Sequence, residues 1–562
     1  MLRTIDTFSF DRLKLSNNIN FVFSVFLLLF FCFFFLNFFA QNFLCKFSRI
    51  MRRILRGTPG KIVQRYASSI SRSLRNTTPT AYKILRNAVA RVEQIGSLGY
   101  KLHLNERERA ANEVIMDLKT AEIQRGLLDP AKFSPGHHIF TMLTKIKESP
   151  LFNILKSMPK GGVLHAHDTA LCSTEFLIEL TYRKNLWICI TDEGCKAIGF
   201  RFSVEEPTMK AMEGCTWEPM ESFRERRGEE NVRQYLMQRF SMYPFSNFRS
   251  NNQAWIHFMG IFILLDGLLL YAPVWGDYYY NALKEFHEDG VQYLELRSLL
   301  PQLYCLNGEK LKISDTVALY KSEVKRFVSE NPDFIGSKLI YAPLRGVEPK
   351  IVDDYVKTCV ALNKKFPDFL VGFDLVGQEE LGRPLIDFVE QLLKMPEHIN
   401  FYFHAGETNW FGSSIDENLF DAILMGTKRI GHGYAITKHP FAMNLCKYLD
   451  IAIEVCPVSN QVLQLGQDYR SHPAALLIAE NVPIVISSDD PSFWRATPLS
   501  HDFYFAFLGI GPWSADLRFL KSLAINSIKY SAMQDKEKPA AFKKWQNKWD
   551  VWVEEVAKLN NK

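Results

Sequence analysis

The stretch GGVLHAHDTA, residues 161–170, places two histidines one residue apart inside an apolar, strand-like run. In a β-strand successive side chains face opposite ways, so His165 and His167 share one face and the residues between them take the other. Asp168 follows directly. One face of this strand therefore presents two imidazoles together. It is either a polar sheet surface or the start of a metal site that other parts of the chain complete.

Seven further apolar runs of strand length follow this stretch. They lie at 291–298, 337–343, 369–377, 399–407, 429–435, 451–457 and 482–490. Segments of helical character separate most of them, which is the βα repeat of a parallel sheet. Eight such units predict an α/β fold, a (β/α)8 barrel over residues 161–562. The alternative is an open doubly wound sheet, but no glycine-rich phosphate turn follows the first strand.

Two segments fall outside the βα rhythm. In residues 80–160 apolar side chains recur at three- and four-residue spacing among charges, which predicts a helical N-terminal domain. Between the first and second strands the chain is far longer than one crossover needs. We therefore expect an inserted subdomain at about 185–250.

Composition excludes several classes of protein. The chain has 562 residues, of which 47% are hydrophobic and 23% charged, as in a globular protein. Residues 1–91 contain 15 Lys and Arg but only two Asp and Glu, a net charge of +13. Because the whole chain carries +6, residues 92–562 carry −7. The body is mildly acidic, so we expect no nucleic-acid binding.

The N-terminus contains a candidate membrane segment. Residues 21–39 are uncharged and apolar apart from Ser24 and Asn37, and their number is near the ~20 that span a bilayer as a helix. Residues 1–50 are therefore predicted to be a signal peptide or a membrane anchor. The basic stretch that follows, a leader or linker at 51–79, opposes export of the body. Translation from Met51 would instead give an organelle-targeting leader.

Ten cysteines in a chain of this length do not form a disulfide scaffold, and no CxxC motif occurs. Cys189, Cys195 and Cys215 lie close together in sequence, so one local bridge fits an exported protein. Asn76, in Asn-Thr-Thr, is a glycosylation acceptor, which is weak support for secretion.

Polar residues collect where the predicted strands end. Barrel enzymes place their chemistry at the C-terminal ends of strands. The residues found there are His165, His167, Asp168, Gly377, His404, Glu407, His432, Asp489 and Asp490. Any one of them has an ordinary structural explanation, but their convergence on one rim favours an active site.

Four of these residues suit zinc. His165, His167, His404 and Asp489 would supply three nitrogens and one oxygen, and a further position would hold water activated as a nucleophile. His432 lies between two glycines and could accept a proton from that water or orient it. Glu407 follows His404 closely and could exchange a proton with substrate. The set predicts hydrolytic chemistry.

The sequence resembles a known family at this point. MPKGGVLHAHD, GFDLVG, FHAGET, RIGHGYA, EVCPVSNQVL and ISSDDP, in this order, look like the adenosine deaminases of the metal-dependent amidohydrolase superfamily. The helical preface, the long insertion, YAPVW and NSIKYS make the chain similar to the adenosine deaminase-related growth factors, the secreted type-2 adenosine deaminases. The resemblance covers about residues 80–555.

The resemblance implies roles for the rim residues. It implies one zinc ion per chain, held by His165, His167, His404 and Asp489. Glu407 would protonate purine N1, His432 would act beside the nucleophile, and Asp490 would meet N7. The backbone N–H of Gly377 would reach N3, where only glycine permits so close an approach. Asp168 would contact the ribose.

Two positions depart from the family pattern. The glutamate and histidine that contact ribose in relatives are replaced here by Met259 and Leu344. We expect deamination of adenosine or 2′-deoxyadenosine to inosine or 2′-deoxyinosine. The alternatives are a related purine, such as AMP, free adenine or an N6-substituted nucleoside, and a growth-factor-like receptor ligand with a vestigial site.

The resemblance also implies how the protein is assembled and where it acts. It predicts a homodimer built largely by residues 80–160, a disulfide between Cys189 and Cys215, and an insertion that could bind a receptor or glycan. It favours a secreted protein, or a type II membrane protein if residues 21–39 are not removed.

Overall fold

The computed structural model describes residues 78–191, 197–208, 214–245 and 247–561. The chain divides into two compact units at Val92, inside helix α4 (Pro79–Gly96). The predicted membrane segment at 21–39, the alternative start at Met51 and the acceptor Asn76 lie outside the described residues.

Eight parallel strands form the centre of the second unit, and every apolar run expected to be a strand contains one. Their bounds are β1 (Gly161–His167), β5 (Val291–Ser298), β6 (Gly336–Tyr341), β7 (Leu370–Phe373), β8 (Asn400–Phe401) with β9 (His404–Ala405), β10 (Arg429–His432), β11 (Ala452–Val455) and β12 (Ile484–Ile486). They pair in two sheets, ordered β1-β5-β6-β7-β8 and β12-β11-β10-β9.

The two sheets join into a closed barrel at both seams. At one seam β8 and β9 are successive parts of one chain segment, separated by two residues. At the other, a parallel bridge links Ala166 to Asp489: the N–H of His167 donates to the Asp489 carbonyl (3.2 Å), and the Asp489 N–H donates to the His165 carbonyl (3.0 Å). The predicted (β/α)8 barrel is therefore confirmed.

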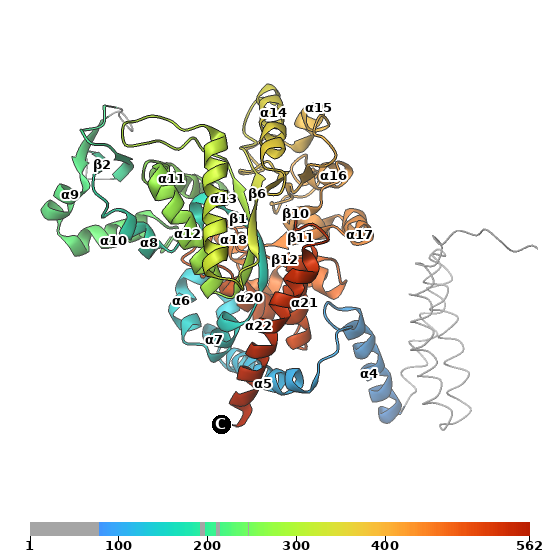
Figure 1. The fold of residues 1–562 in the computed structure, drawn as a ribbon. Helices are drawn as coiled ribbons and strands as arrows, with labels where there is room; N and C mark the ends of the chain where they lie inside the picture. The colour runs from blue at the N-terminus through green and yellow to red at the C-terminus, as the bar shows by residue number, and fades with distance from the viewer. Residues whose placement is uncertain (1–77, 192–196, 209–213, 246, 562) are drawn as a thin grey trace, which may run out of the picture. The chain divides into compact units, whose positions relative to one another are not determined.

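Helices surround this barrel (Figure 1). Those after its strands are α13 (Ile313–Glu330), α14 (Pro349–Lys365), α15 (Val389–Leu392), α16 (Asn418–Leu424), α17 (Pro440–Leu449), α18 (Pro457–Val462), α19 (Ala474–Ala479), α20 (Ser500–Phe505), α21 (Leu517–Lys529) and α22 (Lys538–Lys558). Those before β1 in the second unit are α5 (Glu106–Leu128), α6 (Ile139–Lys147) and α7 (Pro150–Ser157).

The N-terminal helix α5 is fixed to the C-terminal helix α22. Glu108 of α5 is buried, and its carboxylate accepts from the Trp549 indole N–H (2.9 Å) and from Lys521 (2.6 Å). Lys119 lies further along α5 and is also buried. Its ammonium group donates to the backbone carbonyls of Pro512 and Ala515. Two buried, hydrogen-bonded side chains therefore orient α5 against the C-terminal helices.

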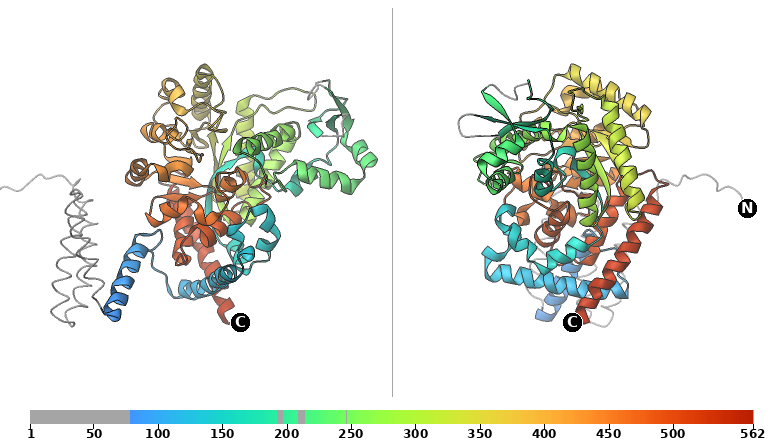
Figure 2. Two further views of the ribbon diagram at one scale, coloured as in Figure 1. Left: turned by 180° about the vertical axis from the view of Figure 1, so that it is seen from behind. Right: turned by 60° about the vertical axis from the view of Figure 1, so that its left-hand side comes forward.

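The segment expected to be an insertion, 185–250, contains a small antiparallel sheet. Its strands are β2 (Leu186–Thr191), β3 (Ala197–Phe202) and β4 (Cys215–Pro219), in the order β3-β2-β4. Helix α8 (Thr174–Leu180) precedes the sheet, and α9 (Met220–Arg227), α10 (Glu229–Arg239), α11 (Asn251–Leu269) and α12 (Ala272–Glu288) follow it. Figure 2 shows this sheet with α9 and α10 beside the barrel. A disulfide joins Cys189 to Cys215 across the β2–β4 pair.

Helix α11 connects this sheet to the barrel. It is the one helix in the described ranges that is long and apolar enough to cross a membrane. However, side chains along its length, including Trp255, Phe258 and Leu265, are buried in the protein core. Buried core helices commonly have this composition, so α11 has the character of a core helix.

Gly267 permits the close approach of α11 to β3, and this predicts the effect of two matched substitutions. A Cβ at Gly267 would lie 1.6 Å from the Phe200 carbonyl oxygen, whereas a Cβ at Gly260, on the same helix, meets nothing within 4 Å. We expect Gly267→Ala to lower the free energy of unfolding by at least ~2 kcal/mol, because backbone must move. Gly260→Ala should raise it by ~0.5–1 kcal/mol, since alanine is the better helix former.

Denaturant unfolding of both variants measures these changes, and hydrogen exchange in β2–β4 locates them. Equal stability of Gly267→Ala and the wild type would show that this contact does not hold the sheet to the helix.

Candidate functional site

The structure brings four of the predicted ligands together. His165 and His167 lie on β1, His404 begins β9, and Asp489 follows β12. One ligand atom of each lies within 4.8 Å of the others. The three histidines come from β1 and β9, which belong to different sheets of the barrel, and Asp489 makes the backbone bridge that closes the barrel. Barrel closure and the cluster thus depend on the same residue.

The spacing of these atoms fits ligation of one metal ion. Asp489 Oδ1 lies 3.3 Å from His165 Nε2 and 3.1 Å from His167 Nε2, and the two Nε2 atoms are 3.3 Å apart. Ligands ~2.0–2.1 Å from a common metal ion lie roughly 3–3.5 Å from one another. Three imidazoles with one carboxylate are also a donor set that zinc accepts. The residues therefore fit a zinc ion.

Two buried carboxylates orient the ligand rings. His165 Nδ1 lies 2.8 Å from Glu454 Oε2, and His404 Nδ1 lies 2.7 Å from Asp374 Oδ2. A ring that donates from Nδ1 keeps the Nε2 lone pair for the metal. Burial lowers the pKa of His404 to about 3, so this ring is neutral, as a ligand must be.

Arg297 connects these two carboxylates beneath the cluster. Its Nε donates to Asp374 (2.7 Å) and its Nη2 donates to Glu454 (2.7 Å), and all three side chains are fully buried. Arg429 pairs with the other oxygen of Glu454 (2.6 Å). Burial would raise the pKa of both carboxyls, but these cations, with His404 beside Asp374, hold them well below their usual range.

Glu407 lies next to His404 and His432. It is 3% exposed, and its Oε1 is 3.5 Å from His432 Nε2. Burial raises the pKa of Glu407 well above its ordinary value, and the neighbouring charges of Asp489 and Glu379 raise it further. This shift favours the protonated carboxyl, which is the form that can give a proton away.

A buried ion pair supports the loop that carries His404 and Glu407. Glu379 accepts from the Glu407 N–H (2.7 Å), and Arg345 donates to the His404 carbonyl (2.7 Å). Arg345 and Glu379 are 3.4 Å apart and almost fully buried. Together they fix the backbone between a ligand and a proton donor.

Asp490 is a second buried carboxyl of the site with a raised pKa. It is 1% exposed, and no hydrogen-bond partner for its Oδ1 is found among the described residues. Burial raises the pKa of Asp490 well above its usual value, and ionised Asp489 adds to the shift. An orphaned buried oxygen on a neutral carboxyl is suited to a ligand atom.

The remaining predicted residues lie at the same rim. Asp168 is buried and accepts from Ser298 (2.6 Å) and Tyr320 (3.2 Å), so protein groups already hold one of its oxygens. Gly377 has φ +107°, and a Cβ there would meet only Leu344 Cδ2, at 3.8 Å. Leu344 is 39% exposed at this edge. Met259 is half-buried on α11 against the core.

Sequence reasoning missed the residues that hold the ligands in place: Arg297, Asp374, Glu454, Arg429, Arg345 and Glu379. Four of them were visible as charges inside or directly after apolar strand runs, in LELRS, FDLVG, RIGH and IEVCP. A charge buried in a barrel strand requires a partner, so this is the signal that could have found them.

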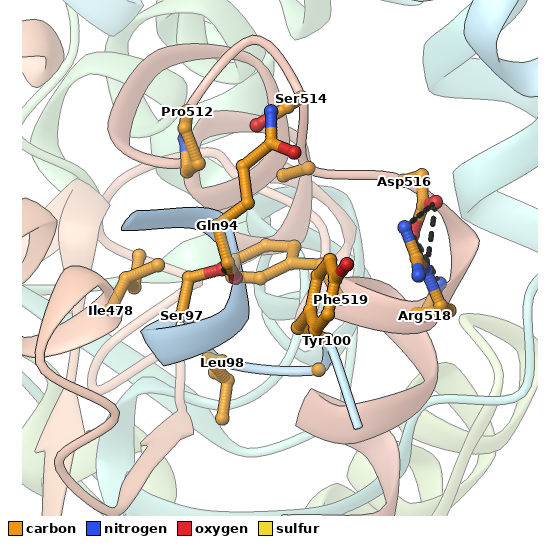
Figure 3. A pocket seen from close by; sticks show the side chains of 12 residues that line it. Gln94, Ser97, Leu98, Tyr100, Ile478, Pro512, Ser514, Asp516, Arg518 and Phe519 are labelled. Carbon is orange, nitrogen blue, oxygen red and sulfur yellow. Dashed lines mark hydrogen bonds and ion pairs between the residues drawn. The ribbon is translucent and has the colours of Figure 1, made fainter. Parts of the chain in front are cut away.

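A surface pocket of the protein lies away from the cluster of His165, His167, His404 and Asp489. Figure 3 shows it between residues 94–100 and the segment 512–519, with Ile478 at one side and the Asp516–Arg518 pair at the other. None of the predicted site residues lines it. It is therefore not the candidate active site.

Comparison with known proteins identifies relatives over most of the chain. The family model "Adenosine deaminase" matches residues 239–547, and the model "Adenosine/AMP deaminase N-terminal" matches residues 31–155. An adenosine deaminase of Lutzomyia longipalpis is 52% identical over 466 residues, 82% of this chain and 91% of that protein. Adenosine deaminase 2 of Homo sapiens is 41% identical over 476 residues, 83% of this chain and 92% of its own.

A solved structure shows the same fold. The crystal structure of Arabidopsis ADAL complexed with GMP aligns with a TM-score of 0.51 at 17% identity, covering 70% of this chain and 98% of that one. At this identity the likeness supports the barrel fold alone.

The Arg297 network predicts a pH-dependent loss of stability. Arg297→Met leaves Asp374 and Glu454 buried without this cation, so the free energy of unfolding should fall by ~3–5 kcal/mol at pH 7. Both carboxyls have depressed pKa values in the folded protein. Their contribution to stability is therefore present above the unfolded pKa of ~4 and is lost as pH falls below it.

The difference in the free energy of unfolding between the wild type and Arg297→Met should therefore become smaller from pH 7 to pH 3. Denaturant unfolding at each pH measures it. Arg383→Met, which breaks exposed pairs with Glu348 and Asp387, is the control and should cost under ~1 kcal/mol. A difference that is constant with pH would contradict the assigned ionisation.

Proposed function

We propose that this chain, which belongs to the adenosine deaminase family, deaminates adenosine with a single zinc ion held by His165, His167, His404 and Asp489. Adenosine and water give inosine and ammonia, and 2′-deoxyadenosine gives 2′-deoxyinosine. The observation that carries the zinc proposal is the convergence of three imidazoles and one carboxylate at distances that suit a shared metal ion.

The protein's own groups account for the proton movements. Zinc, when bound, lowers the pKa of a neighbouring water towards neutral and so supplies the nucleophile. Protonated Glu407 gives its proton to purine N1, which makes C6 more electrophilic as the water oxygen adds there. The C6–N6 bond then breaks, and ammonia leaves with a hydrogen from the water. Inosine retains the oxygen at C6 and the proton at N1.

Three further residues would orient the purine nucleoside. The neutral carboxyl of Asp490 can donate to N7, which accepts only. The N–H of Gly377 can approach N3 because no side chain intervenes. Asp168 has one oxygen held by Ser298 and Tyr320, and its other oxygen, which accepts from Thr169 (3.3 Å), has a second lone pair that would accept from a ribose hydroxyl.

Adenosine is favoured over AMP by what surrounds the ribose end. Leu344 presents an apolar surface beside Gly377, and a phosphate would require cations there. A panel of adenosine, 2′-deoxyadenosine, AMP, adenine and N6-substituted nucleosides tests this choice. Faster turnover of AMP than of adenosine would overturn it.

A receptor ligand with a vestigial site is the alternative function. Vestigial sites lose a ligand or the acid, whereas here every predicted metal and proton-transfer position is filled and in place. We therefore propose catalysis as the principal activity. The β2–β4 sheet and its helices are the surface we propose for a receptor or glycan in any additional signalling role.

We also propose a secreted location, with a type II anchored form if residues 21–39 are retained. The Cys189–Cys215 disulfide supports this, because such bonds persist in oxidising compartments.

Substitution of Glu407 separates proton donation from metal binding. We expect Glu407→Gln to lower kcat ~10²–10⁴-fold, because the amide cannot supply the N1 proton, while one zinc per chain is retained. His404→Ala should lose both zinc and activity, and it serves as the matched comparison. Ammonia release and metal analysis measure the two properties. A Glu407→Gln enzyme within tenfold of wild type, or a fully active zinc-free wild type, would contradict the assignment.

Helix α4 offers a test of the proposed homodimer. Tyr82, Leu85, Val89 and Val92 recur along one face of this helix, which needs an apolar partner. If that partner is a second copy, Leu85→Asp with Val89→Asp should convert a dimer to a monomer in light scattering. Asn87→Asp with Ala90→Asp, on the opposite face, is the charge-matched control. A dimer that survives the first pair would show that α4 does not build it.

A further inference from the structure

The position of one proton on His432 determines what this residue can do. His432 ends β10 between two glycines, has φ +59°, and is buried beside the rings of His165 and His404. Its Nε2 faces the reaction site. A neutral imidazole with its proton on Nδ1 can accept at Nε2, whereas one with its proton on Nε2 can only donate there.

The hydrogen bonds behind His432 begin at a group that can only donate. The backbone N–H of Ala474 lies 3.1 Å from His472 Nδ1. Nδ1 must therefore accept, and the proton of neutral His472 is on Nε2. That N–H lies 3.0 Å from the Asn460 side chain, whose atom at this contact must then be the carbonyl oxygen.

The orientation of Asn460 fixes the next contact. With its oxygen towards His472, its amide N–H₂ faces His432 Nδ1 at 3.2 Å. Amide nitrogen only donates, so His432 Nδ1 must accept and the ring proton is on Nε2. All three side chains are buried, and water does not compete for these bonds. The direction of each bond follows from the Ala474 N–H and not from assigned atom names.

We propose that Asn460 and His472 are positioning residues, which hold His432 with its proton on Nε2 so that it orients the attacking water and cannot take a proton from it. The inference rests on the proposed deaminase function. Of the two roles open to His432, it assigns orientation of the water and not acceptance of its proton.

The space in front of His432 is consistent with this role. Nε2 is 3.5 Å from Glu407 Oε1 and 3.9 Å from Asp489 Oδ2, too long for good direct hydrogen bonds and suited to a water between them. The Nε2–H then donates to the water oxygen. The water's proton goes to Glu407 after that carboxyl has delivered its own proton to N1, so protons balance over the cycle.

Nitrogen NMR of ¹⁵N-histidine-labelled enzyme reads the tautomer directly, with His432→Gln identifying the resonance. We expect a pyridine-like Nδ1 and a pyrrole-like Nε2 in the wild type. The reverse assignment overturns the proposal. The spectrum does not depend on turnover, so a wild type that fails to deaminate adenosine would defeat the proposed function separately.

Two variants test what the bonds do. Asn460→Leu removes the donor to Nδ1, so both tautomers of His432 should be populated. We expect kcat to fall at least ~10-fold with little change in KM, because complete loss of an oriented hydrogen-bond donor lowers a catalytic rate ~10²–10³-fold. His472→Gln supplies an amide N–H in place of Nε2–H and should keep the single tautomer and most of kcat. Asn460→Leu with the wild-type tautomer and wild-type kcat would overturn the proposal.

Discussion

The guanidinium of Arg297 holds the centre of this barrel together. From β5 it reaches the carboxylate after β7 and the carboxylate in β11, and it donates to the carbonyls of Leu164 and Tyr402. Each of those carboxylates in turn holds one ligand histidine. Four hydrogen bonds, two to carboxylates and two to backbone carbonyls, thus converge on one planar, fully buried group, which is the geometry that arginine can satisfy and lysine cannot.

This arrangement separates two kinds of carboxyl within one site. Asp374 and Glu454 lie beneath the ligands, next to arginines, and remain ionised. Glu407 and Asp490 lie above the cluster, where burial and the nearby charge of Asp489 raise the pKa of each carboxyl well above its usual value. The lower pair orients the rings of His165 and His404, and we propose that the upper pair donates protons to a purine. The same burial is therefore accompanied by opposite pKa shifts, because the neighbours differ.

The strand pattern and the rim residues were predictable from sequence. Each apolar run contains a barrel strand, and the polar residues at strand ends converge because parallel strands end at one rim. The supporting network was not predictable, since its partners are far apart in sequence: Arg297 pairs with residues 77 and 157 positions away. Likewise, His472 and Asn460 carry no local signal, because their effect depends on hydrogen-bond direction in three dimensions. The insertion was evident only as excess length, which does not specify a three-stranded sheet.

X-ray absorption at the zinc edge of the purified protein tests the central claim most directly. The account predicts one zinc per chain with nitrogen and oxygen neighbours only, at ~2.0–2.2 Å, as expected for three histidines, Asp489 and water. A sulfur neighbour at ~2.3 Å would instead place Cys456, which lies close to His165 and His432, in the coordination sphere and contradict the assigned ligand set. A fully active protein with no bound zinc would contradict it as well.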